Sequence, residues 1–146
     1  MLVKIATDGS HHEGKFGWAY AVVKEDGTVI GTGYGSGLVD ESWAHGWNVA
    51  AECTAVVRAL EAIKPEIEVE ILHDYEGLGR WARGEWKAKK PCAVGYCAEL
   101  KKLARKVVFT WVRGHDGHDL NETVDSLAYK ALKEQPVSPV IERMAK

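Results

Sequence analysis

The sequence predicts an α/β domain in which helices pack against a mixed β-sheet. Two apolar runs, joined by turn residues that end in Asp26-Gly27, indicate an antiparallel hairpin near the N-terminus. The apolar period then becomes helical, and strands and helices alternate along the rest of the chain. A hairpin extended by strand–helix units gives a mixed sheet. With 146 residues, one compact domain is expected over residues 1–146, with 134–146 as a C-terminal tail.

Three strands are expected in the N-terminal part of the chain, at residues 2–7, 17–24 and 28–37. The first is a short apolar run that ends where Asp8-Gly9 begins. The second and third flank the Asp26-Gly27 turn, so they should pair in an antiparallel manner. Residues 37–47 contain no clear period and are expected to form a loop.

A helix is expected at residues 48–64, because apolar residues recur there at helical spacing. Asn48 is a good N-cap and Pro65 stops the run. Cys53 lies on the apolar stripe and should be a buried, unreactive thiol. The elements expected after this helix are a strand at 67–73, a short helix at 76–83, a helix at 92–105, a strand at 107–112 and a helix at 119–133.

Composition indicates a cytoplasmic protein without a membrane anchor. The three cysteines form no Cys-x-x-Cys pair, which argues against a disulfide framework and a thiolate zinc site. No secretory signal follows Met1, and no apolar run approaches membrane-spanning length. The formal net charge is -2, yet bases are concentrated between Arg80 and Lys106, where only Glu85 and Glu99 oppose them. This region is either a nucleic-acid surface or a solvated helix face.

Two aspartates follow apolar strands. Asp8 comes directly after the first strand and Asp74 directly after the fourth. Catalytic groups often gather at strand ends, because the sheet fixes their position while the end stays open to substrate. For each residue alone, a turn-forming aspartate is an equally good interpretation.

Two further acids border apolar helical stripes. Glu52 lies beside Val56 and Ile63 instead of on the polar face, and Asp125 borders the stripe of the last helix. A carboxylate that points toward a sheet must be paired or bind a metal, although a solvated aspartate near a helix N-terminus is common. If Asp8, Glu52, Asp74 and Asp125 converge, cations must neutralise them, and oxygen ligands suit Mg²⁺ or Mn²⁺.

His115 lies in a loop between the last strand and the last helix, with Gly114 and Gly117 nearby. Beside a metal centre, such a histidine could transfer protons or help the product leave. The alternative is an exposed histidine without a role. His115 and His118 could also be half of a zinc site, but no thiolate or third histidine has suitable spacing.

The four acids and the histidine lie in motifs that resemble type 1 ribonuclease H, from Ile5 to about Leu132. The segment around His115 is the most specific, because a match in the right order behind the others would rarely arise by chance. The matching segments are Thr7-Asp8-Gly9-Ser10, Asn48-Val49-Ala50-Ala51-Glu52, Asp74-Tyr75-Glu76-Gly77 and Gly114-His115-x-Gly117-x-x-x-Asn121-Glu122-x-x-Asp125-x-Leu127-Ala128.

The resemblance implies a ribonuclease H-like mixed five-stranded sheet, with three antiparallel and two parallel strands, flanked by helices. It implies an endonuclease that hydrolyses the RNA strand of RNA/DNA hybrids with two Mg²⁺ ions, for which Mn²⁺ may substitute. The products would carry 5′-phosphate and 3′-hydroxyl ends, and the enzyme would act as a monomer. The implied site consists of four metal ligands (Asp8, Glu52, Asp74 and Asp125), a catalytic loop histidine (His115) and substrate-binding residues (Gly9, Ser10 and Asn48). Trp81, Trp86 and Lys87 are further substrate-binding candidates on their own chemistry, because bases interleaved with aromatic residues suit a groove that follows a nucleic-acid backbone; a solvated helix face is the alternative.

The chain departs from the family pattern in two places. The family often has Asn and Pro after Asp-Gly-Ser, where this chain has His11-His12-Glu13. The segment between Asp74 and Pro91 is shorter than in members with a long basic handle, so substrate affinity could be modest. Two rival functions share the fold: a module that binds nucleic acid without cutting, and a nuclease for another substrate, such as a junction resolvase. A purely structural protein would leave the stripe-edge acids unexplained.

Overall fold

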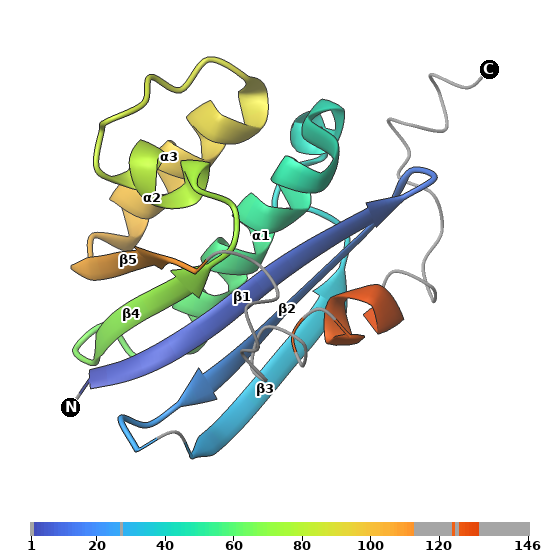
Figure 1. Cartoon of the computed structure of the whole chain (residues 1–146). Coiled ribbons are helices and arrows are strands. Elements are labelled where there is room, and N and C mark those ends of the chain that lie inside the picture. Colours follow the sequence, from blue (N-terminus) through green and yellow to red (C-terminus); the bar gives the residue numbers. More distant parts are fainter. Residues whose placement is uncertain (1, 27, 113–123, 125, 132–146) are drawn as a thin grey trace.

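A computed structural model describes residues 2–26, 28–112, 124 and 126–131 of the chain. Its centre is a five-stranded sheet in the order β3-β2-β1-β4-β5 (Figure 1). The first three strands pair in an antiparallel manner and the β1–β4 and β4–β5 pairs are parallel, so the expected mixed sheet is confirmed. The strands are β1 (Leu2–His12), β2 (Lys15–Val23), β3 (Val29–Ser36), β4 (Glu68–His73) and β5 (Val107–Trp111).

Strand β1 is longer than the sequence predicted. It continues to His12, which pairs with Lys15 across a two-residue turn in which Glu13 and Gly14 have φ values of 50° and 80°. Two positive φ values suit the right-handed twist of a tight hairpin. The expectation that Asp8 ends β1 is therefore wrong, since the hairpin carries the strand past it.

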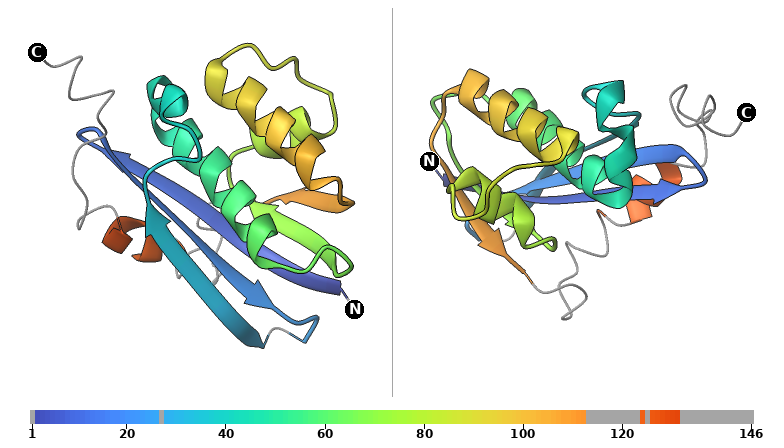
Figure 2. Two further views of the ribbon diagram at one scale, coloured as in Figure 1. Left: turned by 180° about the vertical axis from the view of Figure 1, so that it is seen from behind. Right: turned by 90° about the horizontal axis from the view of Figure 1, so that it is seen from above.

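Three helices and a short 3-10 helix lie on one face of the sheet (Figure 2). The 3-10 helix, η1 (Glu41–Gly46), occupies a segment expected to be a loop. The Asp40 side chain accepts a hydrogen bond of 2.9 Å from the Ser42 amide and so caps the start of η1. The helices are α1 (Trp47–Ala62), α2 (Gly77–Ala82) and α3 (Pro91–Leu103).

Helix α1 is buried on more sides than its apolar stripe predicted. It packs on β1 and β2, while α3 and η1 cover its other side. Cys53 is fully buried, as expected, and so are small residues off the stripe such as Ala55. Asn48 is not the N-cap, since the helix begins at Trp47 after Gly46 and no side chain caps it.

The opposite face of the sheet carries the last helix. Val124 and Ala128 pack in a second apolar cluster with alanines of β1 and β2, and residues 126–131 are helical. This confirms the central part of the helix expected at 119–133, while its start lies outside the described residues. Within the part of the chain that the structure describes, no helix is long and apolar enough to cross a membrane.

Candidate active site

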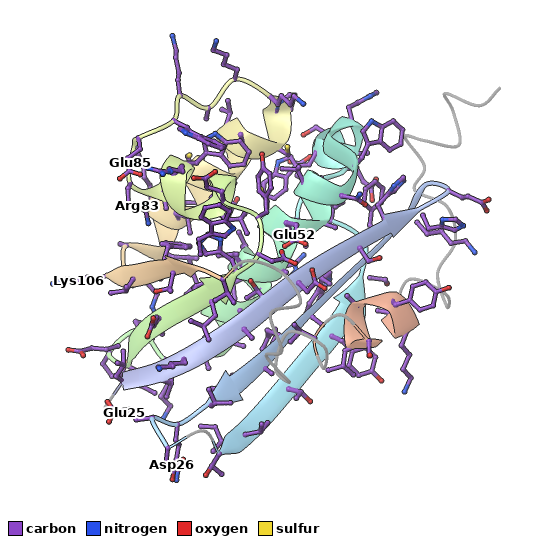
Figure 3. All side chains as sticks on the ribbon, viewed as in Figure 1. Glu25, Asp26, Glu52, Arg83, Glu85 and Lys106 are labelled. Atoms are coloured by element: carbon purple, nitrogen blue, oxygen red, sulfur yellow. The ribbon has the colours of Figure 1, made fainter. Side chains whose placement is uncertain are left out.

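Three carboxylates meet at the centre of the sheet. Asp8 comes from β1, Glu52 from α1 and Asp74 from the residue after β4, and one oxygen of each lies within 4.8 Å of those of the other two. Asp8 and Glu52 are 6% and 7% exposed, whereas Asp74 is open to solvent. Figure 3 shows Glu52 projecting from α1 toward β1. The group is therefore anchored in the core and open on one side.

The carboxylates can come together here because the backbone pairing between β1 and β4 ends beside them. The last paired residues of the two strands are Ala6 and Leu72, two residues before each aspartate. Asp8 lies on the sheet face opposite α1, the face of Ala6, yet Glu52 reaches it from the helix. The Gly9 amide lies between them and donates hydrogen bonds of 2.9 Å to Asp8 Oδ1 and 3.0 Å to Glu52 Oε1.

Gly9 also lets α1 approach the sheet closely. A Cβ atom at this position would overlap the main chain of Ala51 and Glu52. Only glycine permits this backbone contact. The resemblance assigned Gly9 to substrate binding, and the structure adds a packing role: a side chain at this position would keep α1 away from the strand that carries Asp8.

The electrostatics of the group are those of a cation site. Burial raises the pKa of Glu52 well above its ordinary value, and the charge of Asp8, a hydrogen bond with Asp8 and the charge of Asp74 raise it further. Glu52 Oε2 is buried and has no hydrogen-bond partner among the described residues. An unpartnered buried oxygen beside two carboxylates fits a metal ion, and an all-oxygen donor set suits a hard divalent cation.

Hydrogen bonds to the main chain of Asp74 and of the preceding residue fix its position at the end of β4. The Trp111 Nε1–H group donates a 3.1 Å hydrogen bond to the Asp74 carbonyl. The Val112 amide donates a 2.7 Å bond to the His73 carbonyl, which extends the β4–β5 ladder to the same point. No role for Trp111 was predicted from the sequence. Its place in the β5 register opposite His73 could not be known before the strands were aligned.

Substituting Trp111 with phenylalanine should weaken metal binding roughly tenfold, because groups that orient metal ligands commonly contribute 10- to 100-fold in affinity. The change keeps an aromatic ring but removes the donor to Asp74. Calorimetric titration with Mg²⁺ or Mn²⁺ measures the effect. Trp86→Phe is the control, since Trp86 is similarly exposed and donates no hydrogen bond to the main chain of Asp74. Equal affinities for the two variants would contradict a positioning role.

The RNase H family model matches residues 2–133, nearly the whole chain. The chain belongs to the RNase H family. It is 32% identical over 146 residues to the Ribonuclease H of Cupriavidus pinatubonensis, covering 89% of this chain and 94% of that protein. Its match to the Ribonuclease H of Anaeromyxobacter sp. (strain K) is 35% identical over 99 residues, with 59% of this chain and 54% of that protein covered. The chain thus spans about half the length of that relative.

Solved structures share the fold of this RNase H family member. RNase H1 from Halobacterium salinarum superposes with a TM-score of 0.75 at 21% identity, covering 92% of this chain and all of that one. LC11-RNase H1, solved in complex with an RNA/DNA hybrid, superposes with a TM-score of 0.75 at 22% identity and covers 90% of this chain and 97% of that one. At these identities the likeness establishes the fold.

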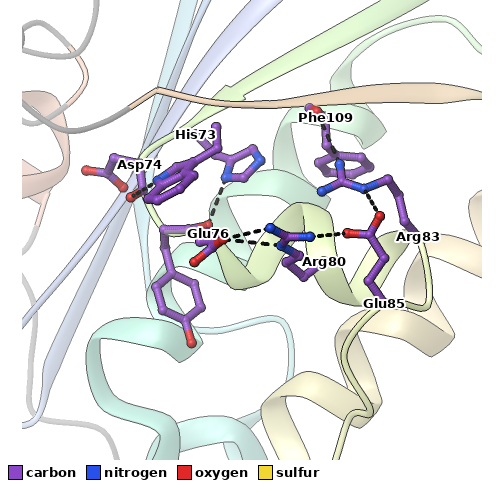
Figure 4. A network of polar contacts seen from close by, with 9 residues as sticks. His73, Asp74, Glu76, Arg80, Arg83, Glu85 and Phe109 are labelled. Atoms are coloured by element: carbon purple, nitrogen blue, oxygen red, sulfur yellow. Dashed lines mark hydrogen bonds and ion pairs between the residues drawn. The ribbon is translucent and has the colours of Figure 1, made fainter.

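In this RNase H domain, a polar network fixes α2 and the turn that follows it (Figure 4). Arg80 bonds to Glu76 and Glu85, and Arg83 bonds to Glu85. Arg83 also donates to the Phe109 carbonyl of β5 over 3.3 Å. These two bases of the basic region are therefore engaged within the fold.

The aromatic and basic residues singled out in the sequence line one groove of about 500 Å³. Trp81, Trp86 and Lys87 lie there with Lys89 and Lys90, and these lysines form no ion pair with another described residue. The remaining lining residues are Val49 on α1, Tyr75 directly after Asp74, and Glu85. The groove thus runs beside the carboxylates and presents unpaired positive charge. Tyr75 lies in the motif Asp74-Tyr75-Glu76-Gly77, but no contact with the substrate was predicted for it from the sequence.

The other expected site residues fall into two groups. Ser10 is half-buried two residues beyond Asp8, and Asn48 is exposed near the start of α1. His115 and Asp125 lie outside the described residues, so their roles stay predictions.

Proposed function

We propose that this chain is an endonuclease that hydrolyses the RNA strand of RNA/DNA hybrids and leaves 5′-phosphate and 3′-hydroxyl ends. One observation carries the proposal: Asp8, Glu52 and Asp74 come together within 4.8 Å in a chain of the RNase H family. A binding module that did not cut would have no need for a carboxylate group that destabilises itself by repulsion. The same group would be expected in a nuclease for another substrate, so the substrate requires a direct test.

Two Mg²⁺ ions are the cofactors we infer, with Mn²⁺ as a substitute. Asp8, Glu52 and Asp74 would hold them, and Asp125 would complete the ligand set. Bound ions of this kind supply an activated water and stabilise the charge on the leaving 3′-oxygen. The protein contributes a rigid frame for the ligands: the Gly9 amide orients two carboxylates, and Trp111 fixes the main chain of the third. His115 would move a proton or help the product leave.

Recognition of the hybrid would combine two surfaces. Gly9, Ser10 and Asn48 would read the RNA 2′-hydroxyls in the minor groove, which distinguishes RNA from DNA. The groove with Trp81, Trp86 and Lys87 would follow a phosphate backbone. Unpaired lysines beside aromatic rings support this assignment. We expect the enzyme to act as a monomer in the cytoplasm, where its free cysteines stay reduced.

The test is cleavage of end-labelled RNA/DNA hybrid, double-stranded RNA and double-stranded DNA, each with Mg²⁺ or with chelator. The wild-type protein should cut only the RNA strand of the hybrid, and only with metal. Asp8→Asn should abolish cutting, since it removes a ligand from the centre of the group. Folded wild-type protein that leaves the hybrid intact in both Mg²⁺ and Mn²⁺ would refute the proposal.

A further inference from the structure

Trp47 has a backbone conformation that its side chain disfavours. It joins η1 to α1 with φ 51° and ψ -126°. Glycine adopts this backbone conformation without strain, whereas bulky residues do not. Among the described residues, only Glu13 and Ala104 share a positive φ without being glycine. Their places are a hairpin turn and the C-cap of α3. Trp47 is likewise the C-cap of η1, where its amide donates to the Ala44 carbonyl. Glycine would fill this place without strain, so a tryptophan here points to a use of its side chain.

The side chain of Trp47 is partly exposed to solvent and packs against other aromatic rings. The residue is 42% exposed, and its ring lies 5.0 Å from the ring of His11, which in turn lies 4.8 Å from that of Phe16. His11 is fixed in orientation, because its Nε2 accepts a 3.1 Å hydrogen bond from the Gly14 amide. His11 and Phe16 of the β1–β2 hairpin thus support Trp47 of α1 in an aromatic cluster whose rings are tilted by 42° and 57° to one another.

The aromatic cluster lies close to the carboxylates. Trp47 precedes Glu52 by five residues, about 7.5 Å along a helix. His11 follows Asp8 by three residues, about 10 Å along a strand. A duplex rises about 3.4 Å per nucleotide along its axis, so these separations correspond to about two to three nucleotides.

We propose that Trp47, supported by His11, is a substrate-positioning residue that packs its indole against a pentose ring of the hybrid about two to three nucleotides from the cleaved bond. The inference rests on the proposed function. It assigns a contact through apolar surface, since the indole carries no charge that would bind a phosphate. The strain at Trp47 is then the cost of presenting a large ring at this position.

Trp47→Gly separates substrate contact from structural support. Glycine relieves the backbone strain, so the melting temperature should stay equal or rise, while KM for the hybrid increases about tenfold, as expected for loss of one apolar contact with the substrate. The value of kcat should change little. In an Asp8→Asn background, hybrid affinity measured by fluorescence anisotropy should fall by the same factor at every salt concentration, because no phosphate contact is lost. Trp47→Phe should recover most of the affinity.

Tyr34→Ala is the matched control, because Tyr34 is an aromatic residue of 44% exposure on β3, and it should leave KM unchanged. Hybrids shortened on the RNA or the DNA strand by about four nucleotides identify the strand that supplies the pentose: only one should lose its dependence on Trp47. The proposal is overturned if Trp47→Gly cuts the hybrid with wild-type KM, or if its melting temperature and kcat fall together. It also fails with the proposed function if wild-type protein neither binds nor cuts the hybrid.

Discussion

Substituting Glu52 with glutamine should reduce metal-dependent cleavage of the hybrid by more than about a hundredfold and, at the same time, stabilise the metal-free protein. The first effect follows because outer groups that merely orient metal ligands contribute up to about 100-fold, and loss of a proposed ligand such as Glu52 should have a larger effect. The second follows because Glu52 is buried beside two other acids and its pKa is raised well above its ordinary value. Glutamine keeps an oxygen for the Gly9 amide and removes the repulsion.

The same raised pKa fixes the pH dependence of the metal-free protein. Folded Glu52 keeps its proton at pH values where the unfolded side chain, whose ordinary pKa is 4.5, has lost it. The native state then binds more protons than the unfolded state. The free energy of unfolding therefore falls as the pH rises above the pKa that Glu52 has in the unfolded chain. This fall should be smaller in Glu52→Gln. Added Mg²⁺ should stabilise the wild type and have little effect on the variant.

Thermal melts of both proteins between about pH 4 and pH 8, with chelator and with Mg²⁺, measure all of these effects. Glu61→Gln is the matched control, since Glu61 lies on the same helix in an exposed ion pair with Arg58. Its melting curve should resemble that of the wild type under every condition. A metal-free Glu52→Gln protein that melts below the wild type across this range would show that Glu52 is not under electrostatic strain.

Local patterns were sufficient to predict the fold and the acids, but not the contacts that hold the acids. The hairpin, the helical period of α1 and the strand–helix alternation are short-range signals, and they yielded the mixed sheet. Glu52 could be identified because a carboxylate at the border of an apolar helical stripe interrupts the helical spacing of apolar residues. Gly9 and Trp111 act through partners 43 and 37 residues away, and such pairings exist only once strands and helices are placed.

Errors in the predicted boundaries have the same origin. Asp8 was expected to end β1 because turn-forming residues follow it, yet pairing with β2 extends the strand to His12. Asn48 has the chemistry of an N-cap, but the preceding η1 leads the chain into α1 at Trp47. Tertiary context thus overrides local preference at two of the places where substrate contacts are proposed.

Arg105 illustrates the same limit at the other end of α1. Its basic side chain suggested a nucleic-acid surface, but its guanidinium donates four hydrogen bonds to main-chain carbonyls where α1 ends and the chain turns into β4. The distances are 3.1 Å to Leu60, 2.6 Å to Ile63, 3.0 Å to Lys64 and 2.6 Å to Ile67. The last carbonyls of a helix have no partner within it, so this one side chain substitutes for a C-cap.

Arg105→Met should therefore destabilise the protein by about 2–4 kcal/mol, because each bond from a charged donor contributes more than a neutral one and the carbonyls lose this side-chain partner. Arg105→Lys should recover little, since an ammonium cannot reach four carbonyls as a planar fork does. Urea unfolding measures the free energy of unfolding of both variants.

Lys106→Met is the control, because it removes an exposed neighbouring charge and should change the free energy of unfolding by less than about 0.5 kcal/mol. If Arg105→Met matches Lys106→Met, the four bonds contribute nothing net. A loss of stability with unchanged hybrid affinity would assign Arg105 to the fold and remove it from the bases available to the substrate.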